Sequence, residues 1–119
     1  MLGQKKYETY RDFWLDNHDV RYSEPFVFVT AKRVTCADGY NVSIQASRTH
    51  YCNPRRYLEC GSYQSWELGF PTEADDLLTE YAEDKDSPLK TVYGYVPNDV
   101  VDTLLKKHGG IVGLSLIHI

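Results

Sequence analysis

The sequence predicts an α+β fold with an antiparallel-dominated sheet of about four strands packed with two to three helices, in the order α-β-β-β-α-β-α. Two observations support this prediction. Short runs of β-branched and aromatic residues alternate apolar with polar side chains, which is typical of half-buried strands. Near both ends of the chain, apolar residues instead recur three and four positions apart, as they do on a helix that covers a sheet. A length of 119 residues suits one domain, which we expect to span residues 1–113.

The first element is expected to be a helix from about Lys5 to Asn17, because its aromatic residues follow helical spacing: Tyr7, Tyr10, Phe13 and Trp14. The segments 17–19 and 23–25 then carry turn residues. An apolar run from Phe26 to Val29 continues through Val34 to Cys36, and the following Ala-Asp-Gly turn predicts a hairpin with the alternating strand 40–46. The first half of the chain should therefore supply the start of the sheet.

The segment 47–62 contains turn residues such as Asn53, Pro54 and Gly61, and we expect an irregular loop there. A third strand is predicted over 63–70, with Trp66, Leu68 and Phe70 facing inward and Tyr63, Ser65 and Glu67 facing outward. These strands should form a meander.

After this strand, Pro71 and Thr72 are expected to open a short helix that includes Tyr81 and is ended by the segment 84–88, with Asp75 in the return position of a capping box. The neighbouring carboxylates Asp75 and Asp76 are expected to lie on a solvated face. A fourth strand follows over 91–96. A last helix, capped by Asn98, should bury a stripe that ends at His108 and should carry Lys106 and Lys107 in its final turn before Gly109.

The final six residues, Leu114 to Ile119, read Leu-Ser-Leu-Ile-His-Ile. This hexapeptide resembles the translation of a transposase-type sequencing adapter, so we expect 114–119 to be a non-native tail rather than part of the domain. The alternative is a short C-terminal strand.

Composition predicts a globular cytoplasmic protein. Charged residues make up 25% of the chain, and neither a membrane-spanning run nor the apolar stretch of a secretory signal is evident. The three cysteines are Cys36, Cys52 and Cys60, an odd number that favours free thiols in a reducing compartment. Because the sequence shows no membrane-spanning run, we expect no membrane partner.

Charge is unevenly distributed along the chain. Residues 21–56 contain six basic and two acidic side chains, whereas residues 67–102 contain ten acidic and two basic ones. The two segments should give the molecule a positive side and a negative side, which can complement each other within a chain or between copies of a homo-oligomer. The sequence pI of about 5.5 argues against binding to long nucleic acid.

Arginine and aromatic residues gather in the loop 47–62, where they point to anion binding. Arginine offers paired donors that match phosphate, and aromatic rings stack on nucleobases. The predicted ligand-binding residues are Arg48, His50, Tyr51, Arg55 and Arg56. A solvated basic loop is the plainer interpretation, because no glycine-rich phosphate loop is present.

Other chemistry in this loop is less well supported. His50, Cys52 and Cys60, joined by Cys36, match the ligand set of a zinc site, but their spacing does not follow the common zinc motifs. A nucleophilic Cys52 activated by His50 is the second alternative. Because no acid and base pair is visible, the sequence predicts no catalytic residues. It also predicts no metal and no cofactor.

The stretch 35–56 resembles small accessory proteins encoded by phages and prophages of gut bacteria. The likeness rests on Cys36-Ala37-Asp38-Gly39, on Ser43-Ile44-Gln45-Ala46-Ser47 and on His50-Tyr51-Cys52-Asn53-Pro54-Arg55, and it extends faintly to Tyr93-Gly94-Tyr95-Val96-Pro97 and Lys107-His108-Gly109-Gly110. No activity or site residue carries over with it. The resemblance implies a protein of the host bacterial cytoplasm that counters bacterial immunity.

Two functions follow as expectations. The first is a non-enzymatic protein that sequesters a small phosphorylated or cyclic nucleotide signal of bacterial immunity, enclosed with the help of a second copy. The alternative is a protein that inhibits an immune nuclease, as anti-CRISPR proteins do, by presenting the acidic segment 67–86 to a basic surface.

Overall fold

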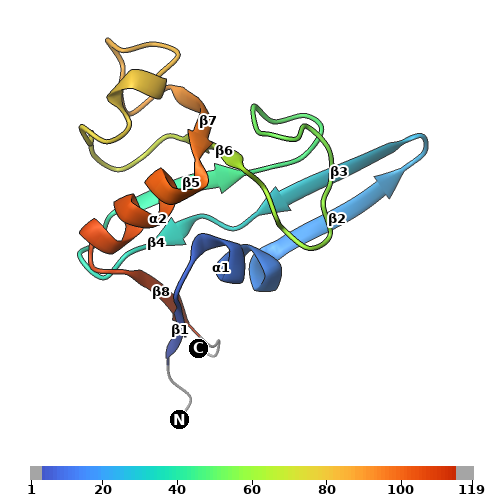
Figure 1. Cartoon of the computed structure of the whole chain (residues 1–119), viewed down its shortest axis with the longest axis horizontal. Coiled ribbons are helices and arrows are strands. Elements are labelled where there is room, and N and C mark those ends of the chain that lie inside the picture. Colours follow the sequence, from blue (N-terminus) through green and yellow to red (C-terminus); the bar gives the residue numbers. More distant parts are fainter. Residues whose placement is uncertain (1–3, 115–119) are drawn as a thin grey trace.

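A four-stranded antiparallel sheet organises the molecule, and the α+β class predicted from the sequence is confirmed (Figure 1). The computed structural model describes residues 4–114. Its elements are β1 (Gln4–Tyr7), α1 (Tyr10–Asn17), β2 (His18–Ser23), β3 (Phe26–Ala31), β4 (Val34–Thr35), β5 (Asn41–Gln45), β6 (Ser65–Gly69), the 3₁₀ turn η1 (Thr79–Tyr81), β7 (Val92–Pro97), α2 (Asn98–Lys107) and β8 (Ile111–Leu114). Within the described range, no helix is long and apolar enough to cross a membrane.

The central sheet has the strand order β4-β5-β6-β7, so the predicted meander of three strands is confirmed, and the predicted fourth strand pairs with the last of them. Val42 and Ile44 of β5 are fully buried while their neighbours are half-buried, as the alternation in the sequence indicated. The helices complete the core: the ring of Tyr10 in α1 meets the ring of Trp66 edge to face at 4.8 Å between centroids. From α2, Leu104 and Leu105 are buried in the same cluster.

The first helix is shorter than predicted. It begins at Tyr10, because the side chain of Thr9 accepts a hydrogen bond from the backbone N–H of Asp12 at 3.2 Å and so caps the helix. Residues 4–7 instead form β1, which pairs with β8. Tyr7 matched the helical spacing because its ring packs edge-on against Phe13 at 5.3 Å. The helical spacing of Tyr7 therefore reflects its contact with the helix, although Tyr7 is not part of the helix.

A hairpin of β2 and β3 extends away from the central sheet (Figure 1). β2 was not expected, because all of its side chains are exposed or half-buried and show no apolar alternation. β3 pairs with β2 and does not continue into β4. The side chain of Gln45 accepts from the N–H of Ala31 at 2.8 Å and donates to its carbonyl at 2.9 Å, and so links the hairpin to β5. The predicted hairpin of β4 and β5 around residues 36–40 is confirmed.

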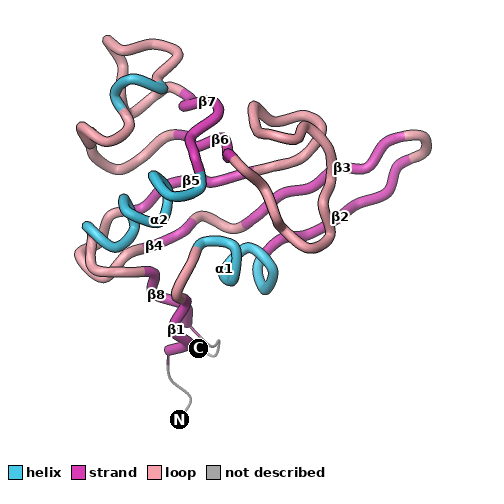
Figure 2. The backbone as a smooth tube through the Cα atoms, viewed as in Figure 1, coloured by secondary structure: helices cyan, strands magenta, loops and turns pink. Residues whose placement is uncertain are grey.

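Two long loops flank β6, as Figure 2 shows, and they explain why the predicted faces of this strand were partly wrong. Tyr63 and Ser65 are buried rather than outward-facing, because the loop 47–62 covers that side: the Tyr63 hydroxyl donates to the carbonyl of Arg56 and accepts from the N–H of Leu58. Phe70 is about half exposed rather than buried, with a positive φ of 51° where the chain leaves the sheet. Trp66 and Leu68 are buried as expected.

The helix predicted over 72–81 is wrong apart from η1. Thr72 does not cap a helix, because its hydroxyl accepts a hydrogen bond from the N–H of Asn41 on β5. Asp75 is only 8% exposed, so the expected solvated face is also wrong for this residue. Asp76 is exposed.

The last helix is confirmed with a different cap. Pro97 occupies the N-cap position, and Asn98 is engaged elsewhere, because its side-chain oxygen accepts from the indole N–H of Trp66 at 3.0 Å. Gly109 follows the helix with a positive φ of 97°. Of the predicted tail 114–119, only Leu114 lies within the described residues, as the last residue of β8, and the other five lie outside them.

Candidate functional site

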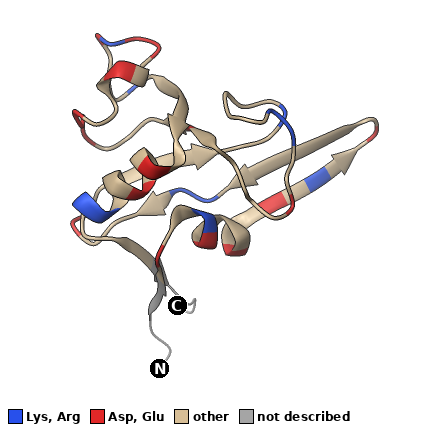
Figure 3. Cartoon of the chain, in the orientation of Figure 1, with Lys and Arg blue, Asp and Glu red and all other residues tan. Residues whose placement is uncertain are grey.

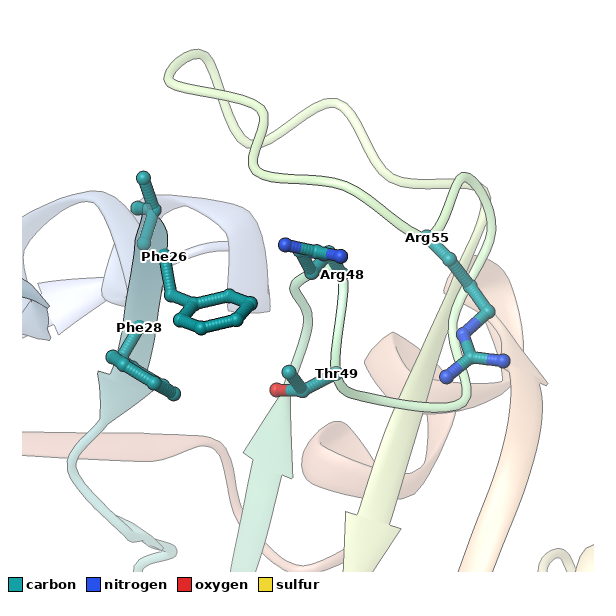
Figure 4. A pocket seen from close by; sticks show the side chains of 6 residues that line it. Phe26, Phe28, Arg48, Thr49 and Arg55 are labelled. Carbon is teal, nitrogen blue, oxygen red and sulfur yellow. The ribbon is translucent and has the colours of Figure 1, made fainter. Parts of the chain in front are cut away.

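A pocket of ≈ 480 Å³ lies between β3 and the start of the loop 47–62. Figure 4 shows its walls: Phe26 and Phe28 stand on one side, Arg48 and Thr49 in the middle, and Arg55 on the other side. Val27 completes the lining. The volume falls in the range that ligand sites for small molecules occupy, about 300–1,000 Å³. The loop that the sequence marked as basic therefore meets an aromatic strand at a cavity.

The aromatic wall follows from the pleat of β3. Successive side chains of a strand point to opposite faces, so Phe26 and Phe28 share one face while Val29 faces the other. Val29 is buried in the core, whereas both phenylalanines are nearly half exposed. Two exposed phenylalanine rings at one cavity are unusual for a solvated strand and provide an apolar surface for a flat ligand.

A tight turn positions Arg48 and Thr49. The N–H of His50 donates to the carbonyl of Ser47 at 3.3 Å, which places the two intervening residues at the corner of a turn. The buried hydroxyl of Ser47 bonds the N–H of Thr49 at 3.1 Å and lies 3.0 Å from the Thr49 hydroxyl. The Arg48 guanidinium carbon lies 5.5 Å from the centre of the Phe26 ring, so the cation rests over the aromatic wall.

Arg55 lines the pocket on the side opposite the two phenylalanines, as Figure 4 shows, and is supported by Tyr51. Its guanidinium carbon lies 5.3 Å from the centre of the Tyr51 ring. Tyr51 is held in turn by a hydrogen bond from the N–H of Tyr95 to its carbonyl at 3.0 Å, and the two tyrosine rings lie 6.0 Å apart. Tyr51 therefore positions Arg55 and does not itself line the pocket.

His50 faces inward. Its Nδ1 lies 2.7 Å from the Ser47 hydroxyl, and the ring is half-buried beneath the turn. Burial lowers the pKa of His50, and the nearby Arg55 cation lowers it further. A neutral imidazole at this position holds the turn without adding a charge.

The pocket is electrically positive. Among the described residues, no carboxylate lies within ion-pair distance of Arg48 or Arg55. Glu67 is the carboxylate that interacts with Arg55 over a longer distance; burial raises the pKa of Glu67, while the N–H of Tyr51 and the charge of Arg55 act to lower it. The two guanidinium groups are thus available to an anion.

The other residues predicted for this site have different positions. Arg56 is exposed on the same loop and does not line the pocket. Phe26, Val27, Phe28 and Thr49 line it but were not predicted as site residues. The signal for the three residues of β3 was its apolar run, which the sequence predicted only as part of the sheet.

The described residues do not support the cysteine chemistry. Cys36 and Cys52 are buried and Cys60 is exposed, and the three do not come together with His50 as a group of candidate metal ligands within residues 4–114. Burial raises the pKa of the Cys52 thiol, which donates to the carbonyl groups of Ser47 and Pro54 rather than facing His50.

The chain matches no protein-family model, no curated protein and no solved structure.

Proposed function

We propose that this protein binds a small phosphorylated ligand with a flat ring, of the nucleotide class, without converting it. The observation that carries the proposal is that two arginines, neither with a described carboxylate within ion-pair distance, and two exposed phenylalanines line one cavity. Guanidinium groups bind phosphate through paired, charge-assisted hydrogen bonds, and aromatic rings stack on nucleobases. The pocket thus offers both halves of a nucleotide a complementary surface.

Binding without turnover fits the same lining. The side chains that face the cavity are aromatic, aliphatic, hydroxyl and guanidinium groups, and His50 is turned inward to Ser47. A lining of this kind can hold an anion but presents no paired acid and base for hydrolysis. The pocket is open on one side, so a second copy of the chain would enclose the ligand further.

The biological setting comes from the resemblance to phage accessory proteins. In that setting the ligand is a cyclic or linear nucleotide that signals infection, and the protein sequesters it in the cytoplasm of the host bacterium. This assignment of the ligand goes beyond the pocket chemistry and depends on the resemblance.

The direct test is release of a bound ligand. The purified protein is incubated with a pool of cyclic and linear nucleotides, separated from the free pool and denatured, and the released molecules are identified by mass spectrometry. An intact nucleotide is expected. Release of a cleaved product would instead show an enzyme, and release of nothing would count against nucleotide binding.

Variants sharpen this test. Arg48→Ala and Arg55→Ala should each weaken binding by about 10- to 100-fold, because a hydrogen bond to a charged group contributes about 1.5–3 kcal/mol. Lys106→Ala removes one positive charge from the last turn of α2, away from the pocket, and should bind like the wild type. Arg56 was predicted from the sequence as a ligand residue but does not line the pocket, so Arg56→Ala should bind like the wild type if the pocket is the site. Wild-type affinity in both Arg48→Ala and Arg55→Ala would refute the assignment.

A second candidate function rests on the acidic segment between β6 and β7. Figure 3 shows acidic residues along this loop, which projects from the sheet. Its exposed carboxylates are Glu73, Asp76, Glu80, Glu83, Asp84 and Asp86. Such a surface suits a basic partner such as the nucleic-acid-binding face of an immune nuclease. Binding to such a nuclease should weaken steeply as salt is raised, and salt-independent binding would contradict this function.

A further inference from the structure

A second cluster of ionisable side chains lies at the opposite end of the sheet from the pocket and plays no part in the proposed nucleotide binding. Its centre is His108, which directly follows α2 and is only 7% exposed. Nδ1 of His108 lies 2.7 Å from Asp38 Oδ2, in the turn between β4 and β5, and 3.9 Å from Glu73 Oε2. Three separate chain segments therefore meet at one imidazole.

The other nitrogen of the ring is held from behind. Nε2 of His108 lies 2.8 Å from Asp75 Oδ2, and the Asp75 side chain is 2% exposed. The second oxygen of Asp75 accepts from the Lys107 ammonium at 3.0 Å and from the N–H of Leu77 at 2.9 Å. A histidine that ligates a metal characteristically donates its other N–H to a fixed carboxylate, which orients the ring and strengthens its ligating nitrogen. Asp75 has this relation to His108.

The front of the cluster is open to solvent and rich in negative charge. The side chains of Asp38 and Glu73 are 46% and 60% exposed, so an ion can reach the edge of the ring that carries Nδ1. Three carboxylates, from Asp38, Glu73 and Asp75, outnumber the two cations beside them, the Lys107 ammonium and a protonated His108 ring. A bound dication would offset that excess.

The spacing of the front atoms suits a transition-metal ion. One ligand atom each from Asp38, Glu73 and His108 lies within 4.8 Å of the other two. Ligand atoms about 2.0–2.2 Å from a tetrahedral Zn²⁺ are separated by about 3.3–3.6 Å. A bound ion would replace the 2.7 Å hydrogen bond between His108 Nδ1 and Asp38 Oδ2, and the exposed Glu73 side chain, 3.9 Å from the same nitrogen, would move toward it.

Tyr40 provides an independent sign of a missing polar partner. Its ring stacks on the His108 ring at 3.9 Å, and the residue is 2% exposed. Its hydroxyl is buried without a hydrogen-bond partner among the described residues. A buried hydroxyl beside this cluster can take an ordered water or a metal-bound water as its partner.

We propose that Asp38, Glu73 and His108 form a binding site for one divalent transition-metal ion of the Zn²⁺ class, with Asp75 as the carboxylate that orients His108. One nitrogen and two oxygen ligands suit Zn²⁺ better than Ca²⁺, which takes six to eight oxygens. The ion joins the turn after β4, the loop after β6 and the end of α2. Binding of the ion should therefore stabilise the folded state.

The test uses protein treated with a chelator, dialysed and titrated with Zn²⁺ in a calorimeter. One equivalent should bind to the wild type and should raise the melting temperature. Glu73→Gln and Asp38→Asn should weaken binding by at least about tenfold and reduce the thermal shift. Glu80→Gln removes the same charge from an exposed side chain of η1 and should behave like the wild type. Glu73 is exposed, so Glu73→Gln should fold normally even if Asp38→Asn does not.

Co²⁺ identifies the ligands directly. The Co²⁺ complex should show visible d–d absorption without the intense near-ultraviolet band of a cobalt–thiolate bond. A thiolate band would place the metal at the cysteines and overturn the proposal. So would the absence of stoichiometric Zn²⁺ binding, or equal affinity in the wild type, Glu73→Gln and Asp38→Asn, in which case the cluster is an ion-pair network alone. None of these outcomes bears on nucleotide release from the pocket of Arg48 and Arg55.

Discussion

The pocket beside β3 and the cluster around His108 bring charged side chains together in opposite ways. In the pocket, Arg48 and Arg55 are exposed, and no described carboxylate lies within ion-pair distance of either. In the cluster, His108 and Asp75 are buried and each makes several polar contacts. Exposed unpaired charge remains available to a ligand, whereas buried paired charge fixes the chain that carries it. The first region should therefore tolerate substitution, and the second should not.

The largest expected effect tests the buried half of this comparison. Asp75→Ala should lower the free energy of unfolding by about 3–5 kcal/mol, because it leaves the buried His108 and the neighbouring Lys107 without their shared carboxylate. Asp76→Ala is the matched control: it removes an exposed carboxylate one position away and should change stability by less than about 0.5 kcal/mol. Urea denaturation with a chelator present measures both. Equal stability of the two variants would show that the cluster does not hold the fold.

A smaller effect compares two glycines with positive φ, one near each region. An alanine Cβ at Gly61, at the end of the pocket loop, would lie 2.9 Å from the Trp14 ring, whereas Gly39, beside Asp38, has no atom within 4 Å of that position. Gly39→Ala should therefore cost only the left-handed backbone strain of about 1–2 kcal/mol. Gly61→Ala should cost about 1–3 kcal/mol more, because the core must shift. Similar unfolding midpoints for the two variants would contradict the close packing of the loop on α1.

The smallest expected effect is a pH dependence. Because burial and Arg55 lower the pKa of His50 in the folded state, the unfolded chain binds more protons as pH falls below the ordinary value of 6.5. Wild-type stability should therefore decrease between about pH 7.5 and about pH 5.5 by more than that of His50→Gln, which cannot take up the proton. The difference between the two proteins isolates this group from the other titrating residues. A constant difference across that range would mean that His50 is not perturbed.

The sequence predicted the central sheet because its strands bury one face in a regular alternation. Val42, Ile44 and Leu68 carried that signal, and all three are fully buried. β1 and β2 carried no such signal, because neither strand forms by burying one face. β1 pairs with the distant β8, and β2 pairs with β3 in an exposed hairpin. The helix predicted over 72–81 failed because Thr72 and Asp75 form tertiary hydrogen bonds where a cap was expected.

For a related reason, only one of the two candidate sites could be predicted from the sequence. Arg48 and Arg55 lie within one short stretch, so their clustering was apparent from the sequence, although their aromatic partners on β3 were not. The cluster joins residues far apart in the chain: Asp38 and His108 are 70 positions apart, and Asp75 and His108 are 33 apart. No local pattern records such a meeting, because it exists only after the sheet has formed.

The pairing of β1 with β8 has a consequence for the timing of folding. Tyr7 lies opposite Ile111, so this ladder closes nearly the whole described chain into a ring. Closing so long a loop is entropically costly, and contacts of such sequence separation form late. During synthesis one flank of α1 therefore stays uncovered until β8 has left the ribosome. The ladder of β1 and β8 should be among the last parts of this fold to form.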